Sequence, residues 1–248
     1  MVGTNILVDA VQQSGAKRFV AISTDKAVSP SGVMGASKRM ASLIVRDAAR
    51  RSGRSFAVVR FGNVLGSRGS VVPYFEAQIE RGGPVTITHP EMTRFFMTVS
   101  EAVHLVLEAG GMSTGGELFV LNMGEPVRII DLAEDLIRLS GFTTDQIPSI
   151  TTGIRPGEKL EEALWEDEAT VEPTAHPDIL RVTEPLTPAG DLRAAVKTLE
   201  HAAQEGDRLR AEAILCDWIP TFTPWLTSLP SRVDQESEQN LTGRRSRP

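Results

Sequence analysis

An alternation of amphipathic helices and apolar strands over the first 61 residues constrains the fold more than any other feature of this sequence. Residues 4–13 and 36–51 carry apolar side chains at helical spacing. Two apolar runs of strand length, 17–23 and 55–61, alternate with these helices, and no hairpin signal joins them. Strands that are joined through helices pair in parallel, because a parallel pair needs a long crossover connection. We therefore predict a doubly wound α/β fold built on a parallel sheet.

Beyond residue 70 the alternation becomes irregular, and we predict a smaller mixed α/β lobe laid on the sheet. Caps, turn residues and apolar runs indicate a helix opened by Pro73 and ended at Gly82-Gly83, short strands within 84–88 and 94–98, a helix capped at Ser100, a strand within 117–124, a helix from Asp131 and a helical stretch over 191–218. Residues 229–248 are polar, charged and without periodicity, so we expect a disordered tail there.

The composition excludes several classes of partner. Lys and Arg number 26 against 32 Asp and Glu, a net charge of -6, which argues against nucleic acid and anionic membranes. No uncharged apolar stretch approaches the roughly 18 residues of a membrane helix, and the opening residues lack a secretion signal. The single cysteine, Cys216, is expected to pack in a helix, and its isolation predicts a reducing, cytoplasmic location. The four histidines show no metal-ligand spacing, so we predict no metal site and a small-molecule partner.

The loop after the first predicted strand carries the most informative polar residues, Ser23-Thr24-Asp25-Lys26. In parallel α/β sheets ligands bind outside the carboxyl ends of the strands, and these residues lie at such an end. Lys38 follows in the first turn of the next helix, within Met34-Gly35-Ala36-Ser37-Lys38. Alone, these four loop residues are typical of a turn whose hydroxyls bind backbone groups and whose lysine is solvated. A chemical interpretation therefore needs further matching residues.

Such residues are present. The run STDKAVSPSGVMGASKR resembles the active-site segment of the extended short-chain dehydrogenase/reductases, specifically the nucleotide-sugar 4,6-dehydratases of capsular and flagellar polysaccharide biosynthesis. Four further runs match in the same order and extend the resemblance over most of residues 1–215: RFGNVLGSRGSVVPYF, TRFFMTVSEAVHLVLEAG, LNMGEPVRIIDLAEDLI and GIRPGEKLEEAL. The family normally shows Tyr-x-x-x-Lys, whereas Met34 stands at the tyrosine position and the chain's one tyrosine is Tyr74. The large, usually membrane-anchored dehydratases of the family carry a similar Met-x-x-x-Lys.

The resemblance implies a truncated doubly wound parallel sheet of the NAD(P)-binding Rossmann type with a smaller mixed α/β substrate lobe. Residues 1–75 would be the carboxyl part of the Rossmann-like domain, and 76–228 mainly a substrate-binding lobe with some strands returning to the sheet. Gly62-x-x-x-Gly66-x-x-Gly69 is not read as a dinucleotide fingerprint, because no strand ending in an acidic residue follows about 20 residues later. The glycine-rich units that hold NAD or NADP in the family are not found, so we expect this chain to bind the dinucleotide weakly.

The resemblance also assigns roles to individual residues. Its catalytic positions are Thr24, Asp25, Lys26, Met34 and Lys38, its cofactor-binding positions are Ser23 and Lys38, and its substrate-binding positions are Asn63, Arg94, Arg155 and Glu158. Asp25 would protonate the departing C6 hydroxyl and Lys26 would take the C5 proton. Lys38 would hold the nicotinamide ribose, and Thr24 or Ser23 would bind the C4 oxygen.

Two points stay open at this stage. Met34 has no group that accepts the C4 hydroxyl proton, which leaves a water molecule or Lys26 for that step. Arg94 and Arg155 suit the oxygens of a diphosphate, but either arginine could instead pair with an acid such as Glu91 or Glu158 and hold the small lobe together.

The functional reading is a 4,6-dehydratase for a UDP-N-acetylhexosamine, or the catalytic half of one, that uses NAD or NADP. A UDP-sugar is the expected partner, and a homo-oligomer is compatible with this reading. The alternatives are an inactive sugar-nucleotide-binding fragment and a nucleotide-sugar epimerase. Thr24-Asp25-Lys26 favours the dehydratase over the epimerase, because an epimerase needs no acid and base pair for the loss of water.

Overall fold

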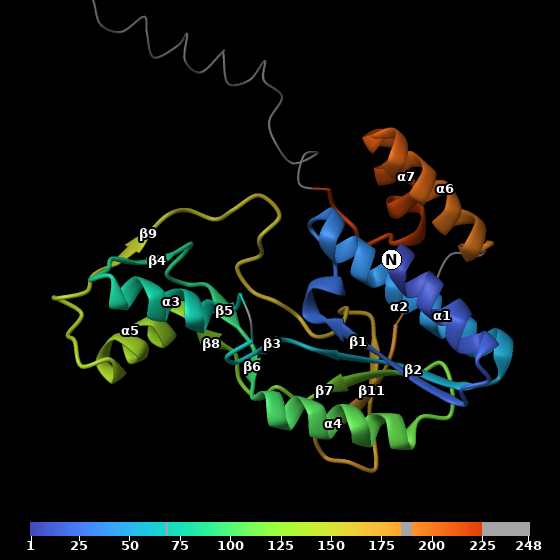
Figure 1. The fold of residues 1–248 in the computed structure, drawn as a ribbon, viewed down its shortest axis with the longest axis horizontal. Helices are drawn as coiled ribbons and strands as arrows, with labels where there is room; N and C mark the ends of the chain where they lie inside the picture. Colours follow the sequence, from blue (N-terminus) through green and yellow to red (C-terminus); the bar gives the residue numbers. More distant parts are fainter. Residues whose placement is uncertain (68, 185–189, 225–248) are drawn as a thin grey trace, which may run out of the picture.

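The computed structural model describes residues 1–67, 69–184 and 190–224 of the chain. The tail predicted at 229–248 lies outside these described residues. The described part forms a sheet with helices on both faces and a second group of helices and short strands beside it (Figure 1).

A five-stranded sheet forms the centre of the larger part, in the order β1-β2-β7-β11-β10. Its strands are β1 (Arg18–Thr24), β2 (Ser55–Phe61), β7 (Leu118–Leu121), β10 (Thr170–Pro173) and β11 (Ile179–Thr183). β1, β2 and β7 run parallel, which confirms the parallel prediction for the first part of the chain. β11 and β10 extend the sheet as an antiparallel pair, so the complete sheet is mixed.

Helices cover both faces of this sheet, as a doubly wound fold requires. α1 (Val2–Gln13) and α2 (Val33–Ser52) lie on one face, and α4 (Val99–Met112) lies on the other (Figure 1). α2 ends at Gly53, which adopts the left-handed conformation with φ 65° that favours glycine after a helix. α4 does not begin at the predicted Ser100 cap, because Thr98 caps this helix in a capping box with Glu101.

The helical stretch predicted over 191–218 is two helices, α6 (Leu192–Glu205) and α7 (Arg208–Trp218). Gly206 has φ 72° and ends α6, and the side chain of Asp207 accepts a hydrogen bond from the backbone N–H of Arg210 to begin α7. The signals of the break are the glycine stop and the aspartate cap, which the periodicity of apolar residues alone does not reveal. Cys216 is exposed on α7, so its predicted packing role is wrong, while its neighbour Leu215 is buried.

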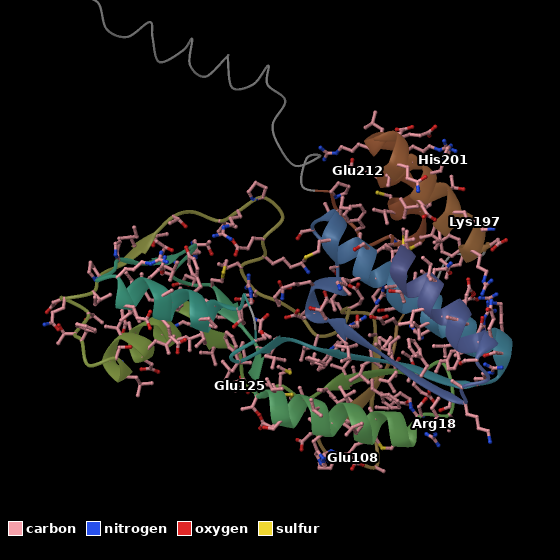
Figure 2. The ribbon with its side chains drawn as sticks, in the orientation of Figure 1. Arg18, Glu108, Glu125, Lys197, His201 and Glu212 are labelled. Carbon is pink, nitrogen blue, oxygen red and sulfur yellow. The ribbon has the colours of Figure 1, made fainter. Side chains whose placement is uncertain are left out.

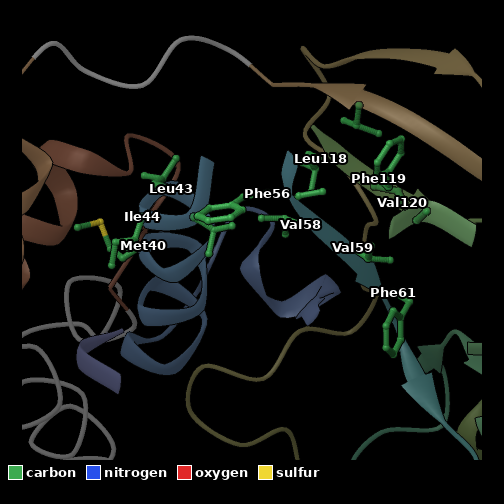
Figure 3. Close-up of a cluster of buried hydrophobic side chains, with 14 of the residues drawn as sticks. Met40, Leu43, Ile44, Phe56, Val58, Val59, Phe61, Leu118, Phe119 and Val120 are labelled. Atoms are coloured by element: carbon green, nitrogen blue, oxygen red, sulfur yellow. The ribbon is translucent and has the colours of Figure 1, made fainter. Parts of the chain in front are cut away.

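The main core lies between α2 and the centre of the sheet. Figure 3 shows side chains of α2, β2 and β7 meeting there, with Met40, Phe56, Leu118 and Phe119 among the largest that are fully buried. Burying a side chain of this size stabilises a fold by about 1.5–3 kcal/mol. Burial of β2 along nearly its whole length fixes the position of the residues that follow its carboxyl end.

A second group of elements has its own small core. It contains α3 (Val71–Glu80), β4 (Val85–Ile87), β5 (Thr93–Arg94), β8 (Val127–Arg128), α5 (Ile129–Leu139) and β9 (Ser149–Thr151). Phe75, Ile79, Ile137 and Ile147 are buried in its centre. Two short strands, β3 (Asn63–Val64) and β6 (Phe96–Met97), pair in parallel. In the chain, β3 leads from the large sheet into the second group, and β6 leads from the second group to α4. The candidate site lies where these parts meet the sheet.

Charged side chains from several elements lie on the outer surface. Arg18, Glu108, Glu125, Lys197 and His201 are exposed, and Figure 2 shows them on the outside of the molecule. Within the described residues, no helix is long and apolar enough to span a bilayer.

Candidate active site

At the end of β1, the neighbours Thr24 and Lys26 both donate hydrogen bonds to one carboxylate oxygen of Asp25. A single 3-10 turn, η1 (Asp25–Ala27), follows the strand and is capped by the Thr24 side chain. Asp25 Oδ1 accepts from the Thr24 hydroxyl at 2.8 Å, from the Lys26 backbone N–H at 2.9 Å and from Lys26 Nζ at 3.0 Å. The predicted trio of hydroxyl, acid and amine therefore forms one hydrogen-bonded group.

Asn63, the first residue of β3, also joins this group. Lys26 Nζ donates to Asn63 Oδ1 at 3.2 Å. Because β1 and β2 are parallel with Thr24 opposite Phe61, the residues that follow each strand emerge at the same edge of the sheet. Asn63, which the family resemblance places at the substrate diphosphate, thus lies beside the predicted base.

Asp25 is fully buried, and its second oxygen has no partner. Within the described structure Oδ2 accepts no hydrogen bond. Gly62 lies against this oxygen, and a Cβ at that position would come within 3.3 Å of Oδ2 and 2.9 Å of the Phe95 Cβ. A Cβ at Gly35 would be 2.3 Å from the Lys26 carbonyl oxygen. The two glycines allow α2 and the residues after β2 to pack closely around η1.

The structure does not bring Ser23, Met34 and Lys38 into this hydrogen-bonded group. The buried Ser23 hydroxyl lies 3.0 Å from the Ser42 hydroxyl and ties β1 to α2. Met34 is 59% exposed and Lys38 is exposed one turn later. The lone tyrosine, Tyr74, is on α3, where its hydroxyl lies 3.2 Å from the Thr86 hydroxyl.

Arg94 and Arg155 have different surroundings. The buried Arg94 guanidinium donates to the carbonyls of Thr93 at 2.6 Å, Leu160 at 3.0 Å and Lys159 at 2.8 Å, and its Nη2 is 4.0 Å from a Glu158 oxygen. Arg155 is exposed and its guanidinium pairs with no acid among the described residues, while its backbone N–H donates to Glu158. Arg94 thus holds the chain near residue 160 in place, and Arg155 keeps its guanidinium free.

Residues 153–166, here called the strap, cross over the loop that follows β1. After β9 the chain returns across the molecule toward this loop (Figure 1). Ser31 donates to the Gly157 carbonyl at 2.7 Å, and Lys159 Nζ donates to the Val28 carbonyl at 2.6 Å. Glu166 accepts from the backbone N–H of Ser29 at 2.9 Å and also from its hydroxyl. Ser29 has a positive φ of 33°, and these bonds to Glu166 hold it in that conformation.

The strap also contributes Glu162, which the sequence did not predict as a site residue. Its side chain is only 5% exposed, and its Oε2 has no hydrogen-bond partner in the described structure. Burial raises the pKa of Glu162, and the charge of Asp25 raises it further, against the opposing effects of Lys26, Lys159 and Arg94. Glu162 is therefore within electrostatic reach of the acid and the amine of η1. Its neighbour Glu161 is exposed, and nothing in the irregular sequence of the strap distinguishes the two.

Residues that fit a dinucleotide lie at the start of α2. Lys38 is exposed in the first turns of the helix, and its amine pairs with no acid in the part of the chain that the structure describes. A free ammonium at the carboxyl edge of a parallel sheet suits the hydroxyls of a ribose. Among the described residues, no group of three His, Cys, Asp or Glu side chains is placed to hold a metal ion.

The parallel core, the helices on both faces and a polar site at the carboxyl ends of β1 and β2 define a protein with a Rossmann-type α/β fold. More specifically, residues 1–184 match the polysaccharide biosynthesis protein family, and the chain belongs to this family.

Relatives in sequence agree with this assignment. The chain is 49% identical over 220 residues to a Bacillus subtilis protein named probable polysaccharide biosynthesis protein EpsC, a match that covers 83% of this chain and 37% of the relative. It is 36% identical over 166 residues to the UDP-N-acetylglucosamine 4,6-dehydratase (inverting) of Campylobacter jejuni, with 65% and 47% covered. A UDP-glucose 4-epimerase of Rickettsia canadensis is 42% identical over 167 residues, with 66% and 48% covered. The chain thus spans less than two thirds of the length of these relatives.

Solved structures show the same fold. Pen from Bacillus thuringiensis superposes with a TM-score of 0.66 at 36% identity, over 77% of this chain and 59% of that one. The dTDP-glucose 4,6-dehydratase of Bacillus anthracis, solved in complex with NAD, gives a TM-score of 0.58 at 18% identity, over 66% and 58%. The second likeness supports the Rossmann-type fold alone.

Proposed function

We propose that this chain carries the catalytic and sugar-nucleotide-binding part of a nucleotide-sugar 4,6-dehydratase that acts on a UDP-N-acetylhexosamine. The observation that carries this proposal is the hydrogen-bonded pair of Asp25 and Lys26 at the carboxyl edge of the sheet. A 4,6-elimination needs one group that gives a proton and one that takes a proton on the same side of the sugar. The 36% identity to a UDP-N-acetylglucosamine 4,6-dehydratase supports the reaction and the substrate class.

In this proposal the pair moves protons while the cofactor moves hydride. When bound, NAD or NADP would accept a hydride from C4 of the sugar and return it to C6. Lys26 would remove the C5 proton, and Asp25 would give a proton to the C6 hydroxyl, which leaves as water; Lys26 would then return a proton to C5 as hydride is added at C6. Because Lys26 Nζ and Asp25 Oδ1 are 3.0 Å apart, a proton taken by the amine can pass directly to the carboxylate.

Other residues orient the sugar nucleotide and the cofactor. The Thr24 hydroxyl would bind the C4 oxygen, and Lys26 or a water molecule would take the C4 hydroxyl proton, since Met34 has no group for that step. Arg155 would bind the diphosphate with its free guanidinium, and Arg94 with Glu158 would hold the strap that carries Arg155. Lys38 would bind the nicotinamide ribose, with Ser23 tying β1 to the middle of α2 through Ser42.

One observation favours a second candidate, a nucleotide-sugar epimerase, because the Rickettsia relative of that name is 42% identical to the chain. An epimerase would use the same C4 chemistry but would need no acid for the C6 hydroxyl. The two candidates therefore differ in the product, which is a 4-keto-6-deoxy sugar for the dehydratase and a C4 epimer for the epimerase. A third reading, a fragment that binds sugar nucleotide without reaction, gives neither product.

The test joins the amino-terminal part of EpsC to this chain, or mixes the two, and incubates them with UDP-N-acetylglucosamine and NAD+ or NADP+. Proton NMR should show a 4-keto-6-deoxy product that disappears in Lys26→Ala and persists in Lys17→Ala, which replaces an exposed lysine outside the site. A C4 epimer as the product would establish the epimerase instead. UDP binding without any product from the assembled protein would support the inactive reading.

A further inference from the structure

The loop between η1 and α2 is held in place by segments from much later in the chain. Each of its residues 28–31 bonds to such a segment, and the partners are Lys159 for Val28, Glu166 for Ser29, Thr223 for Pro30 and Gly157 for Ser31. Three of these partners lie on the strap, and the fourth lies after α7. The loop leads from the acid and base of η1 to α2, which carries Lys38, so its conformation sets how these groups lie relative to one another.

Glu166 is the side chain at which the loop, the strap and the segment after α7 meet. Its Oε1 accepts from the Ser29 backbone N–H at 2.9 Å and from the Thr221 hydroxyl at 3.0 Å, and its Oε2 accepts from the Ser29 hydroxyl. Glu166 is 6% exposed, and all the donors recorded for it among the described residues are neutral. A buried carboxylate is costly even when donors satisfy it, so its presence here indicates a need for this geometry of acceptors.

These bonds hold Ser29 in an unfavourable backbone conformation. Its φ is 33°, and no other non-glycine residue of the described chain has a positive φ. The residue before a proline favours extended backbone, and Pro30 follows Ser29. Ser29 is itself exposed, so the two bonds to Glu166, rather than burial, keep it in this conformation. Without them Ser29 would relax to a negative φ, and the chain would leave η1 in another direction.

The direction of this loop fixes the start of α2 against η1. The helix begins at Val33, and a Cβ at Gly35 would be only 2.3 Å from the Lys26 carbonyl oxygen, so the two backbones are in close contact. Lys38 follows in the next turn of the same helix. The position of Lys38 relative to the pair of Asp25 and Lys26 therefore depends on the conformation of the loop.

We infer that Glu166 is a positioning residue for the transfer of hydride between sugar and cofactor. By holding Ser29, it fixes Lys38, which would bind the nicotinamide ribose, relative to Asp25 and Lys26, which would act on the sugar. Such a reaction is sensitive to this placement, because a displacement of about 1 Å can cost roughly 100-fold in rate. The inference rests on the proposed function and deepens it by giving a role to a residue that acts only through Ser29.

A role in stability alone predicts different behaviour. If Glu166 only tied the three segments together, Glu166→Ala would lower the melting temperature, and the folded fraction would turn over as the wild type does. If Glu166 positions Lys38, kcat falls in protein that is fully folded at the assay temperature. KM for the UDP-sugar should then change little, because Arg155, the residue proposed to bind the diphosphate, lies at the other end of the strap.

The experiment measures kcat and KM for the chain assembled with the amino-terminal part of EpsC. Glu166→Ala should lower kcat roughly 10- to 100-fold and leave KM for UDP-N-acetylglucosamine within about threefold of the wild type. Glu166→Gln keeps the shape, an acceptor for the Ser29 N–H and a donor to the Ser29 hydroxyl, so its kcat should stay within about threefold of the wild type. Glu168→Ala replaces an exposed glutamate shortly after the strap and is the matched control, which should change neither constant.

Substitutions of Ser29 test the same link at an exposed position. Glycine takes a positive φ without strain, so adding Ser29→Gly to Glu166→Ala should raise kcat at least roughly fivefold. A β-branched residue disfavours a positive φ, so Ser29→Val alone should lower kcat, whereas Ser29→Gly alone should keep most of it. This pair of variants leaves Glu166 in place and decides the matter even where Glu166→Ala does not fold.

Amide hydrogen exchange of the chain without cofactor gives a measurement that does not depend on turnover. The Ser29 amide should exchange roughly tenfold faster in Glu166→Ala than in the wild type, because its N–H loses its acceptor. An unchanged exchange rate, an unchanged kcat in Glu166→Ala, or equal turnover of Ser29→Val and Ser29→Gly would overturn the inference. An assembled wild type that forms neither a 4-keto-6-deoxy sugar nor a C4 epimer would instead contradict the proposed function itself, and this inference would fall with it.

Discussion

Two buried carboxylates in this molecule, Glu184 and Glu162, show opposite electrostatic environments. Glu184 follows β11 and pairs with Arg60 at 2.8 Å, with Arg46 at 3.6 Å and also with Arg39. Burial alone would raise the pKa of Glu184, but Arg60 and Arg39 outweigh burial and lower it. For Glu162 burial and Asp25 act in the same direction and raise the pKa. The charged form of the carboxylate is thus favoured at Glu184 and disfavoured at Glu162.

The two places also differ in the cations that surround the acid. Glu184 lies against three arginines, whereas the one ion pair recorded for Glu162 among the described residues is with Lys159, at 3.7 Å. Arg60 Nη1 also donates to the Leu164 carbonyl at 3.0 Å, so the Glu184 group connects β2, α2, β11 and the strap. We conclude that the arginine group around Glu184 holds the sheet, α2 and the strap together.

The largest expected effect breaks the Glu184 group. Glu184→Gln leaves the buried Arg39 and Arg60 and the half-buried Arg46 without their common acid, and removing one partner of a buried ion pair costs about 3–5 kcal/mol of stability. Urea denaturation followed by circular dichroism measures this loss. Glu172→Gln, on an exposed position of β10, should stay within about 0.5 kcal/mol of the wild type. A Glu184 variant as stable as this control would show that the arginines do not depend on Glu184.

The next effect is on turnover and leaves the fold intact. In the assembled protein with its amino-terminal part, Lys26→Ala and Asp25→Asn should each lower kcat by at least about 100-fold, the usual contribution of a general base or acid. Lys38→Ala should act chiefly through the affinity for the cofactor. Near-normal turnover of Lys26→Ala under saturating NAD+ would remove Lys26 as the base.

A third prediction separates the two arginines of the substrate site. Arg155→Ala should weaken UDP binding roughly tenfold to a hundredfold without changing the melting temperature, because its guanidinium makes no ion pair within the described residues. Arg94→Ala should lower the melting temperature as well, because Arg94 holds the carbonyls of residues 159 and 160. Calorimetry and thermal melts on both variants measure this. If Arg155→Ala binds UDP normally, the residue does not contact the diphosphate.

The parts of the fold that the sequence predicted are those where local signals and tertiary packing agree. β2 was predicted over 55–61 and is Ser55–Phe61, because a buried apolar run lies between Gly53 and the glycine after Phe61. The convergence of Thr24, Asp25 and Lys26 also followed from the rule that ligand-binding residues lie at the carboxyl ends of parallel strands, whereas Asn63 was expected at the diphosphate from the family resemblance. The break at Gly206 was missed because the prediction rested on apolar periodicity and not on the stop and cap formed by Gly206 and Asp207.

The parts of the site that the sequence did not predict come from the strap. Glu162 and Glu166 reach the loop after β1 from more than 130 positions later in the chain, through an irregular segment with no helical or strand periodicity. Their burial depends on bonds made by the segment as a whole, such as Lys159 to Val28 and Arg60 to Leu164. Only the tertiary structure shows which of two adjacent glutamates is turned inward.

The smallest expected effect concerns pH and tests the opening comparison most directly. Because the folded-state pKa of Glu162 is raised above its ordinary value of 4.5, the native state holds a proton there that the unfolded chain has lost, and wild-type stability falls as the pH rises above that value. Glu162→Gln lacks this dependence, so it should match the wild type at low pH and become more stable than the wild type as the pH rises. Glu184 has a lowered pKa, so its contribution to stability is present above 4.5 and is lost as the pH falls through its folded-state value. Urea denaturation of both variants across this range should therefore give differences from the wild type that grow with pH in opposite directions. Differences of the same sign would show that Glu162 is a stabilising side chain, like Glu184.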